Sequence, residues 1–263
     1  MADVRNGENG LNQEALNNLP NWAKLGWGLG KQPTRGPKGE LSVPKIVDAA
    51  IAIADKDGLA AVSMNKVASS LGFTTMSLYR YISSKDDLLM LMQDAVSAMD
   101  IPPEREGVDW REEMREYVRA CVEVFRKHPW FGDISITSVP IMPNTLQIID
   151  WVLRPLRRFP LNDYEKVAIL LLISSYARTC GIIMRDLDRA IQAGATPESF
   201  SGLNYTTALK ELVKPDRYPY LYPVVASGSY TGENVEDNTV GDDFDFGLER
   251  ILDGVEQFLA GKN

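Results

Sequence analysis

The sequence predicts an all-α protein with an N-terminal helix-turn-helix domain followed by a C-terminal helical bundle. Apolar residues recur at helical spacing in most segments after residue 42, and no segment shows the strict alternation that is typical of half-buried strands. Apolar residues make up 44% of the chain, which is enough for a buried core. A glycine turn between two short helical segments near residue 72 indicates the helix-turn-helix.

Composition narrows the class of protein further. The net charge of −8 argues against indiscriminate binding to nucleic acid. The longest apolar run, residues 167–176, is shorter than the roughly 20 residues that cross a bilayer. The N-terminus has no signal-peptide pattern, and Cys121 and Cys180 are expected to be reduced core thiols. We therefore expect a cytoplasmic protein of bacterial type with no membrane partner.

The charge is unevenly distributed along the chain. Residues 24–85 contain nine basic and four acidic side chains, so this segment has a formal charge of +5 and the remainder is strongly acidic. A basic end on an acidic body can bind a polyanion while the rest stays in solvent.

Residues 1–41 are rich in Asn, Gly and Pro and are predicted to form a flexible basic arm. Residues 42–100 are predicted to hold four helices. Ser42, Ser63 and Ser84 are the expected N-caps of the first, second and fourth helices, and residues 75–81 form the third. Gly58 ends the first helix, and Gly72 permits the tight turn between the second and third.

Residues 101–263 are predicted to form the second domain. Amphipathic helices are expected over residues 110–125, 144–156 and 244–259. Residues 162–193 are apolar on nearly every side, which predicts a helix buried all round. Residues 194–243 contain Gly, Pro, Ser and Asn clusters and are expected to be a long connection.

The third helix raises a question of function, because Leu78 and few neighbours can anchor it while its other side chains are polar. In a helix-turn-helix the second helix enters the major groove, where such side chains contact DNA. The segment from "LSVPKIVDAAIAIADKDG" to "TTMSLYRYISSKDDLL" resembles the DNA-binding domain of the TetR (tetracycline-repressor) family. More weakly, "KHPWFGDI", "PNTLQIID" and "FDFGLERILDGVE" resemble the C-terminal domain of its tetracycline-repressor branch.

The resemblance implies a ligand-responsive repressor that binds a palindromic, double-stranded DNA operator as a homodimer and is released by a small, largely apolar effector. Its base-reading candidates are Asn65, Thr75, Met76 and Ser77, and Arg80 can donate to a guanine or to a phosphate. Thr74 is a further DNA-contact candidate. The phosphate-contact candidates are Ser63, Lys66, Tyr79, Tyr81 and Lys85. Packing is the alternative role for Tyr79 and Tyr81. Asn65 departs from the family pattern, because many relatives have arginine at this position.

The arm contains Lys31, Arg35 and Lys38 between glycines that permit close approach to DNA. One interpretation places these side chains along a minor groove. The alternative is a solubilising tail.

One recognition helix reads few bases, so a homodimer on paired half-sites is expected. We expect the helices over residues 162–193 and 244–259 to form its interface; a purely intramolecular core is the alternative. The ligand-site candidates are aromatic, Met and polar residues of the second domain: Trp130, Phe131, Met142, Asn144, Gln147, Trp151, Tyr176, Arg178, Thr179, Ile183 and Met184. Arg178 and Asn144 stand out because a buried cation or amide needs a partner.

Other functions have weaker support. His128 is the only histidine, which gives neither a catalytic triad nor a complete metal site, so no enzyme, cofactor or metal is predicted. Asp242, Asp243 and Asp245 are interpreted as a solvated helix start. An activator or DNA-organising protein of the same fold, or a ligand-binding helical protein without regulation, remains an alternative.

Overall fold

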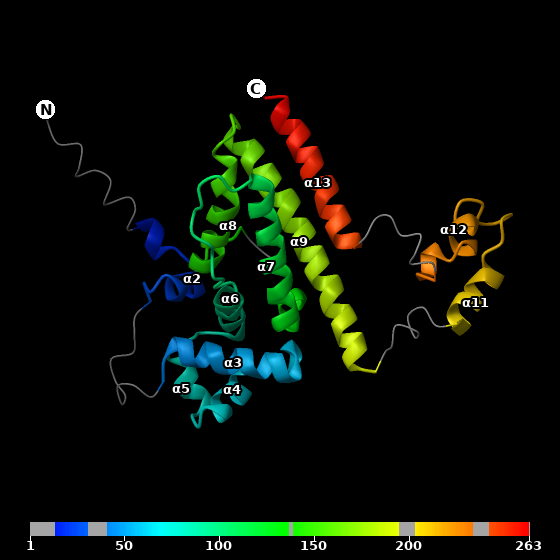
Figure 1. The fold of residues 1–263 in the computed structure, drawn as a ribbon. Helices are drawn as coiled ribbons and strands as arrows, with labels where there is room; N and C mark the ends of the chain where they lie inside the picture. Colours follow the sequence, from blue (N-terminus) through cyan, green and yellow to red (C-terminus); the bar gives the residue numbers. More distant parts are fainter. Residues whose placement is uncertain (1–13, 31–40, 137–138, 195–202, 234–241, 263) are drawn as a thin grey trace, which may run out of the picture. The chain divides into compact units, whose positions relative to one another are not determined.

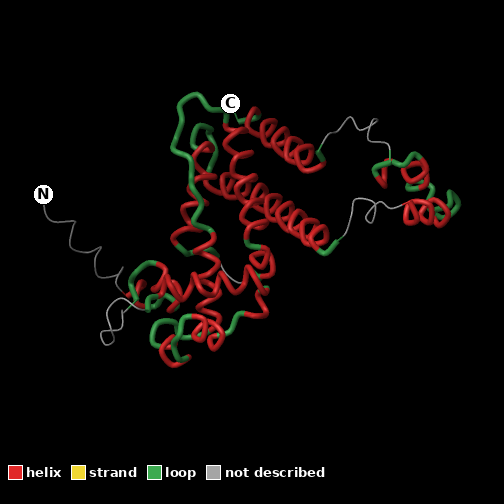
Figure 2. The backbone as a smooth tube through the Cα atoms, turned by 60° about the horizontal axis from the view of Figure 1, so that its bottom comes forward, coloured by secondary structure: helices red, strands yellow, loops and turns green. Residues whose placement is uncertain are grey.

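The computed structural model describes residues 14–30, 41–136, 139–194, 203–233 and 242–262. Within these ranges the chain forms helices and loops and no strand, which confirms the predicted all-α class (Figure 2). The chain divides into two compact units after Gly181. The predicted domain boundary between residues 100 and 101 falls inside the first of these units.

The helix-turn-helix domain consists of α3 (Val43–Asp57), α4 (Met64–Ser70), α5 (Thr75–Tyr79) and α6 (Lys85–Val96). In Figure 1, α3, α4 and α5 lie at the bottom of the first unit and α6 rises above α3. The three predicted serine caps are confirmed: Ser42, Ser63 and Ser84 each accept a hydrogen bond from the backbone N–H three residues ahead. Gly72 has a φ of +75°, the left-handed conformation that the turn between α4 and α5 requires. The helix starts are therefore set by local side-chain chemistry.

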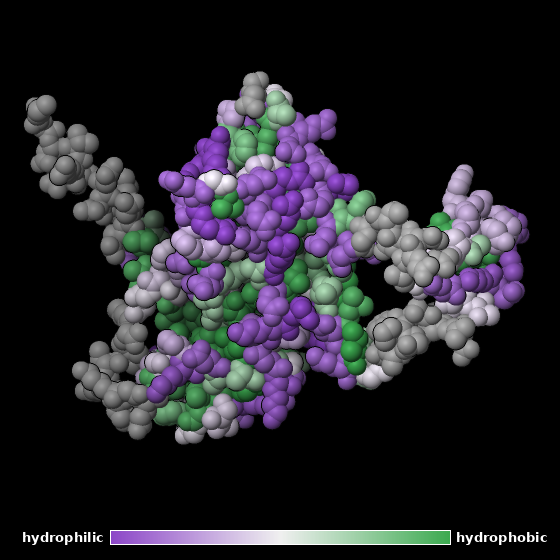
Figure 3. All heavy atoms as spheres, viewed as in Figure 1, coloured by the Kyte–Doolittle hydropathy of each residue, from purple (hydrophilic) through white to green (hydrophobic). Residues whose placement is uncertain are grey.

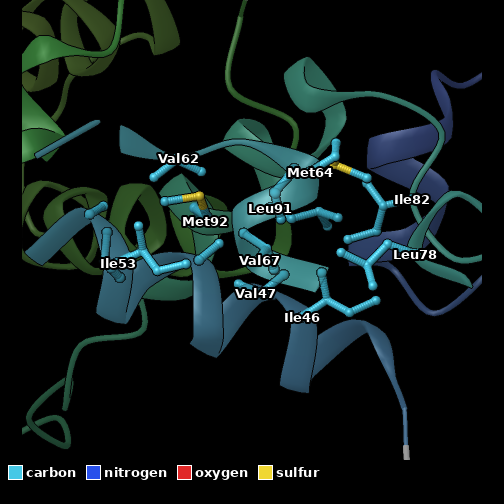
Figure 4. Close-up of a cluster of buried hydrophobic side chains, with 14 of the residues drawn as sticks. Ile46, Val47, Ile53, Val62, Met64, Val67, Leu78, Ile82, Leu91 and Met92 are labelled. Atoms are coloured by element: carbon cyan, nitrogen blue, oxygen red, sulfur yellow. The ribbon is translucent and has the colours of Figure 1, made fainter. Parts of the chain in front are cut away.

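The hydrophobic core of this domain packs against the inner face of α5, where Leu78 lies. Figure 4 shows Leu78 packed among side chains of α3, α4 and α6, with Ile46 and Val67 nearby. Leu78, Ile46, Val67 and Met92 are all fully buried. Burying a Leu side chain contributes about 2 kcal/mol, so one apolar anchor holds α5 on the core, and its other side chains are not buried.

The prediction of a flexible arm over residues 1–41 was wrong for its middle part. Residues 21–26 form a short helix, α2 (Asn21–Gly26), which packs against α6. Ala23 on α2 is fully buried, and Trp22 and Leu25 pack on the core of the helix-turn-helix domain. Apolar burial of these three side chains outweighs the polar composition of the surrounding segment.

The remainder of the first unit contains α7 (Trp110–Lys127), the 3-10 helix η2 (Pro129–Asp133), α8 (Pro143–Leu156) and α9 (Asp163–Gln192) as far as Gly181. Gly181 permits a close approach between α9 and α7, because a Cβ atom there would lie 2.3 Å from the Phe125 ring. Buried Glu113 on α7 accepts from Arg154 of α8 and from Arg158, which follows that helix, each at 3.0 Å. This charge is buried only because it is paired twice.

The prediction that α9 is buried all round was also wrong. Tyr164, Val167, Leu171, Leu172, Ile183 and Ile191 on this helix are all exposed large hydrophobics. By length and composition alone this 30-residue helix is apolar enough to cross a membrane, a test that the core helix of a soluble protein also passes. Figure 3 shows hydrophobic surface along its C-terminal part, where Ile183, Leu187 and Ile191 lie.

The second unit contains α11 (Leu203–Leu212), α12 (Tyr222–Ala226), the 3-10 helix η3 (Ser229–Thr231) and α13 (Asp243–Ala260). The predicted connection over residues 194–243 therefore includes helical structure. The final helix is confirmed, and Asp242 caps it by accepting from the N–H groups of Phe244 and Asp245 at 2.9 and 3.1 Å.

Candidate DNA-reading surface and ligand cavities

The recognition helix α5 presents its predicted contact residues to solvent. Met76 is 71% exposed and Tyr79 is 45% exposed, whereas Leu78 between them is fully buried. Arg80, at the C-terminal end of α5, is also exposed. Side chains on the outer face of a helix of this kind can enter a DNA groove without unfolding any part of the domain.

Hydroxyl groups form hydrogen bonds at the N-terminal end of α5. Thr75 donates from Oγ1 to Oδ1 of Asn65 over 3.3 Å, and the hydroxyls of Thr74 and Ser77 lie 3.0 Å apart. The first bond holds α5 to the first turn of α4. It leaves the Asn65 amide nitrogen available to a base or phosphate.

Two predicted phosphate contacts already have structural roles. Ser63 caps α4, and Lys66 forms an exposed ion pair with Asp57 at 2.6 Å. The hydrogen bond from Lys66 lowers the pKa of Asp57. An exposed pair of this type contributes little to stability, so Lys66 can exchange its carboxylate for a DNA phosphate.

The remaining predicted DNA contacts differ in exposure. Lys85 is exposed at the start of α6, and Tyr81 is half-buried against the domain core, which favours a packing role for its ring. Lys31, Arg35 and Lys38 lie outside the described residues.

A second site joins α3 to η2. Asp55 on α3 accepts from the indole N–H of Trp130 at 2.6 Å, and its carboxylate lies 2.8 Å from Nδ1 of His128. Trp130 is fully buried. The predicted ligand residue Trp130 therefore connects the helix-turn-helix domain to the segment after α7, and Asp55 is a functional candidate that sequence reasoning missed.

Asp94 on α6 forms a third polar site and was also missed. This carboxylate is 5% exposed. Its Oδ1 accepts from the backbone N–H and the hydroxyl of Thr145, and its Oδ2 accepts from Asn144. Desolvation is the largest influence on Asp94 and raises its pKa despite these bonds. The sequence signal that could have identified Asp94 as a buried carboxylate is its position beside the apolar stripe of α6.

Two cavities of the first unit contain four of the predicted ligand residues. A cavity of about 180 Å³ between α6, α8 and α9 is lined by Met142 and Arg178, together with Asp94 and Thr145. A more open cavity of about 470 Å³ on α8 is lined by Gln147 and Trp151. The indole N–H of Trp151 is buried and has no hydrogen-bond partner among the described residues.

The other predicted ligand residues line neither cavity. Asn144 is bonded to Asp94, and Phe131 packs against the rings of Phe125 and Trp130. Tyr176 and Thr179 lie on α9, where Thr179 is exposed. Ile183 and Met184 belong to the second unit. The predicted set is therefore dispersed over several places and does not form one pocket.

Arg178 has its own partners within the protein. Its Nη2 donates to the carbonyl oxygens of Gly132 and Ile134 at 3.3 and 3.2 Å, and its guanidinium lies 5.7 Å from the centre of the Phe125 ring. This cation thus holds the segment after η2 against α9. Among the described residues, no cluster of three His, Cys, Asp or Glu could hold a metal ion.

An exposed recognition helix on a capped helix-turn-helix, attached to a helical domain, defines a DNA-binding transcriptional regulator. The chain belongs to the tetR family of bacterial regulatory proteins, whose model matches residues 46–91. The model of the tetracyclin repressor-like C-terminal domain matches residues 102–259.

Individual relatives agree with this membership. The HTH-type transcriptional repressor DrrR1 of Streptomyces coeruleorubidus is 34% identical over 245 residues, which cover 90% of this chain and 85% of that protein. An HTH-type transcriptional regulator of Saccharopolyspora erythraea is 32% identical over 136 residues, covering 52% of this chain and 58% of that protein. The structure of the TetR family protein ActR of Streptomyces coelicolor in complex with actinorhodin matches with a TM-score of 0.67 at 27% identity, covering 86% of this chain and 98% of that one.

Proposed function

We propose that this protein is a ligand-responsive repressor that binds a palindromic operator as a homodimer and is released by a small, largely apolar effector. The observation that carries the DNA-binding part is the geometry of α5, in which Leu78 alone is buried and Met76, Tyr79 and Arg80 point into solvent. The protein acts in the cytoplasm on the bacterial chromosome, and the proposal includes no catalytic step.

In this proposal Thr75, Met76 and Arg80 contact base edges. Arg80 donates to a guanine, and Met76 packs on a thymine methyl. Tyr79, Lys66 and Lys85 bind phosphate oxygens, which set the position of the domain without reading sequence. Thr75 and Asn65 act as a pair, because the hydrogen bond between them orients both side chains.

The exposed apolar face of α9 supports dimerisation. Leu171 is 67% exposed, and 28% of the most apolar stretch of this helix is buried within one chain. Phe246 and Phe258 are exposed on α13, which extends the same argument to the last helix. A partner chain that covers these side chains removes an apolar surface that water would otherwise solvate.

The effector part is supported by the cavities and by two relatives. ActR was solved in complex with actinorhodin, and DrrR1 is named as a repressor. An effector that binds the DNA-free dimer more tightly than the DNA-bound dimer lowers operator affinity by the same factor.

A selection experiment tests the proposal. The purified protein is incubated with a pool of random DNA duplexes, and the bound sequences are read after several rounds. We expect an inverted repeat, bound by a particle of twice the chain mass. Recovery of sequences without any shared motif, at an affinity equal to that for random DNA, would refute specific regulation.

A further inference from the structure

The short helix α2 is bonded at each end to a different part of the first unit. Near its start, Asn21 donates from Nδ2 to the hydroxyl of Ser83 over 2.8 Å, just after the recognition helix. Just past its end, Trp27 donates from its indole N–H to the carbonyl of Ile141 over 2.8 Å, just before α8. A Cβ atom on Gly26 would lie 2.5 Å from Cε of Met142, so the backbone of α2 lies close against that side chain.

Trp22 on α2 lines two cavities. It lines the cavity of about 180 Å³ that contains Met142 and Arg178, and it also lines a wider cavity of about 630 Å³ around the start of α6. Met90 and Ser135 are the other residues common to both. The two spaces are therefore neighbours, and Trp22 is the side chain between them that comes from outside the matched family domains.

The size of the inner cavity excludes a drug-sized ligand as it stands. Pockets for such ligands measure about 300 to 1,000 Å³, whereas the inner cavity measures about 180 Å³. Trp22 is one of the three residues that line both cavities, so displacing it would enlarge the opening between them. A helix of six residues has little stability of its own, so α2 is held in place by its contacts with the first unit, which include buried Ala23.

The charges around the two cavities indicate the chemistry of the ligand. The outer cavity is lined by Asp86, Asp87 and Asp133, with no basic side chain among its lining residues. The inner cavity has Met90, Ile141 and Met142 in its lining, together with one acidic and one basic side chain. These two, Asp94 and Arg178, are opposite in charge and are both hydrogen-bonded within the protein. An aromatic group fits the inner space, and a positively charged group fits the outer space.

We propose that α2 is a displaceable strap over the effector site, and that an aromatic cation binds by moving Trp22 out from between the two cavities. This inference rests on the proposed function, because it gives the repressor its effector site. When the strap leaves, the hydrogen bond between Asn21 and Ser83 breaks. Ligand binding therefore changes a contact of Ser83, which lies just after the recognition helix. This coupling does not pass through the C-terminal helices.

The test uses the full chain and two fluorescent probes, cationic rhodamine 6G and anionic 1-anilinonaphthalene-8-sulfonate. We expect rhodamine 6G to bind more tightly than the anion and to speed amide hydrogen exchange in residues 20–30. W22A removes the side chain that the ligand must displace, so it should tighten rhodamine 6G binding about tenfold, because the binding-competent form becomes the common one. W22F, which keeps an aromatic ring, should fall between W22A and the unaltered protein.

Two further variants keep the test decisive. N21A removes one exposed hydrogen bond without touching the core, so it folds whatever happens to W22A, and it should tighten binding in the same direction by a smaller factor. L29A changes an exposed apolar residue on the same segment and serves as the matched control with unchanged binding.

Weaker rhodamine 6G binding in W22A would contradict the proposal that α2 is displaced by the ligand. Unchanged amide hydrogen exchange in residues 20–30 while the probe binds would contradict it as well. Tighter binding of the anionic probe would overturn the ligand class. Operator binding measured on the same preparations reports separately on the proposed function.

Discussion

The indole N–H of Trp130 donates to Oδ1 of Asp55 over 2.6 Å, across 75 positions of sequence. This bond connects the last turn of α3 to the segment that follows α7. The helix-turn-helix domain and the helical domain are therefore held together by a polar contact at one of their junctions, in addition to apolar packing.

Removing this bond should destabilise the protein measurably. W130F deletes the N–H donor and keeps an apolar ring, so we expect the free energy of unfolding in urea to fall by about 1–3 kcal/mol. D55A should cost a similar amount, since it leaves the same donor buried. In the double variant the two losses should not add, because both remove one interaction. Strict additivity would show that the bond contributes nothing.

Variants at Met76 and Lys85 should separate two contributions to DNA affinity, which are base recognition and electrostatic attraction to phosphates. M76A should alter the preferred base at one operator position, with a cost of about 1 kcal/mol in affinity for the preferred sequence. K85A should weaken binding to all sequences alike and reduce the slope of log K against log salt by about one. Fluorescence anisotropy at several salt concentrations measures both. K214A, in the second unit, is the control. If the slope of log K against log salt is the same for K85A as for K214A, Lys85 does not contact DNA.

Asp94 should make stability depend on pH in a defined direction. Burial raises its pKa in the folded protein above the ordinary value of 3.8, so the folded state binds more protons than the unfolded state just above that pH. The contribution of Asp94 to stability therefore falls as pH rises from about 4 toward its raised pKa and is constant beyond it.

D94N cannot titrate, so the stability of D94N relative to the unaltered protein should rise over that same pH interval. Urea unfolding between about pH 4 and pH 7 measures the difference. The replacement itself can change stability by an amount that is the same at every pH, so the prediction concerns only the change with pH. A difference between D94N and the unaltered protein that does not vary with pH would contradict it. A relative stability of D94N that falls with rising pH would contradict it.

The exposed face of α9 should be required for dimerisation. L171E places a charge on an apolar surface that is 67% exposed in one chain, so it should leave the chain folded and shift its mass in solution from dimer toward monomer. L212E changes a leucine of α11 that is 74% exposed and should leave the mass unchanged. Equal masses for both variants would exclude this part of α9 from the interface.

Much of the helix-turn-helix domain could be predicted from the sequence, because its signals are local. Ser42, Ser63 and Ser84 each bond to a backbone group three residues away, and Gly72 meets a requirement of its own φ angle. The alternation of buried Leu78 with exposed neighbours follows from helix periodicity alone. These features hold whatever the rest of the chain does.

The remaining features were decided by contacts between distant segments. The bond from Thr145 to Asp94 spans 51 positions, and the packing of α2 on α6 depends on an apolar surface that only the folded domain creates. Periodicity showed that α9 is apolar on most sides but could not show which face one chain leaves uncovered. The sequence by itself determined where helices begin and which side chains of α5 face outward, since those depend on bonds within a few residues. Tertiary structure decided which carboxylates are buried and where cavities lie, since these depend on how helices from distant parts of the chain pack.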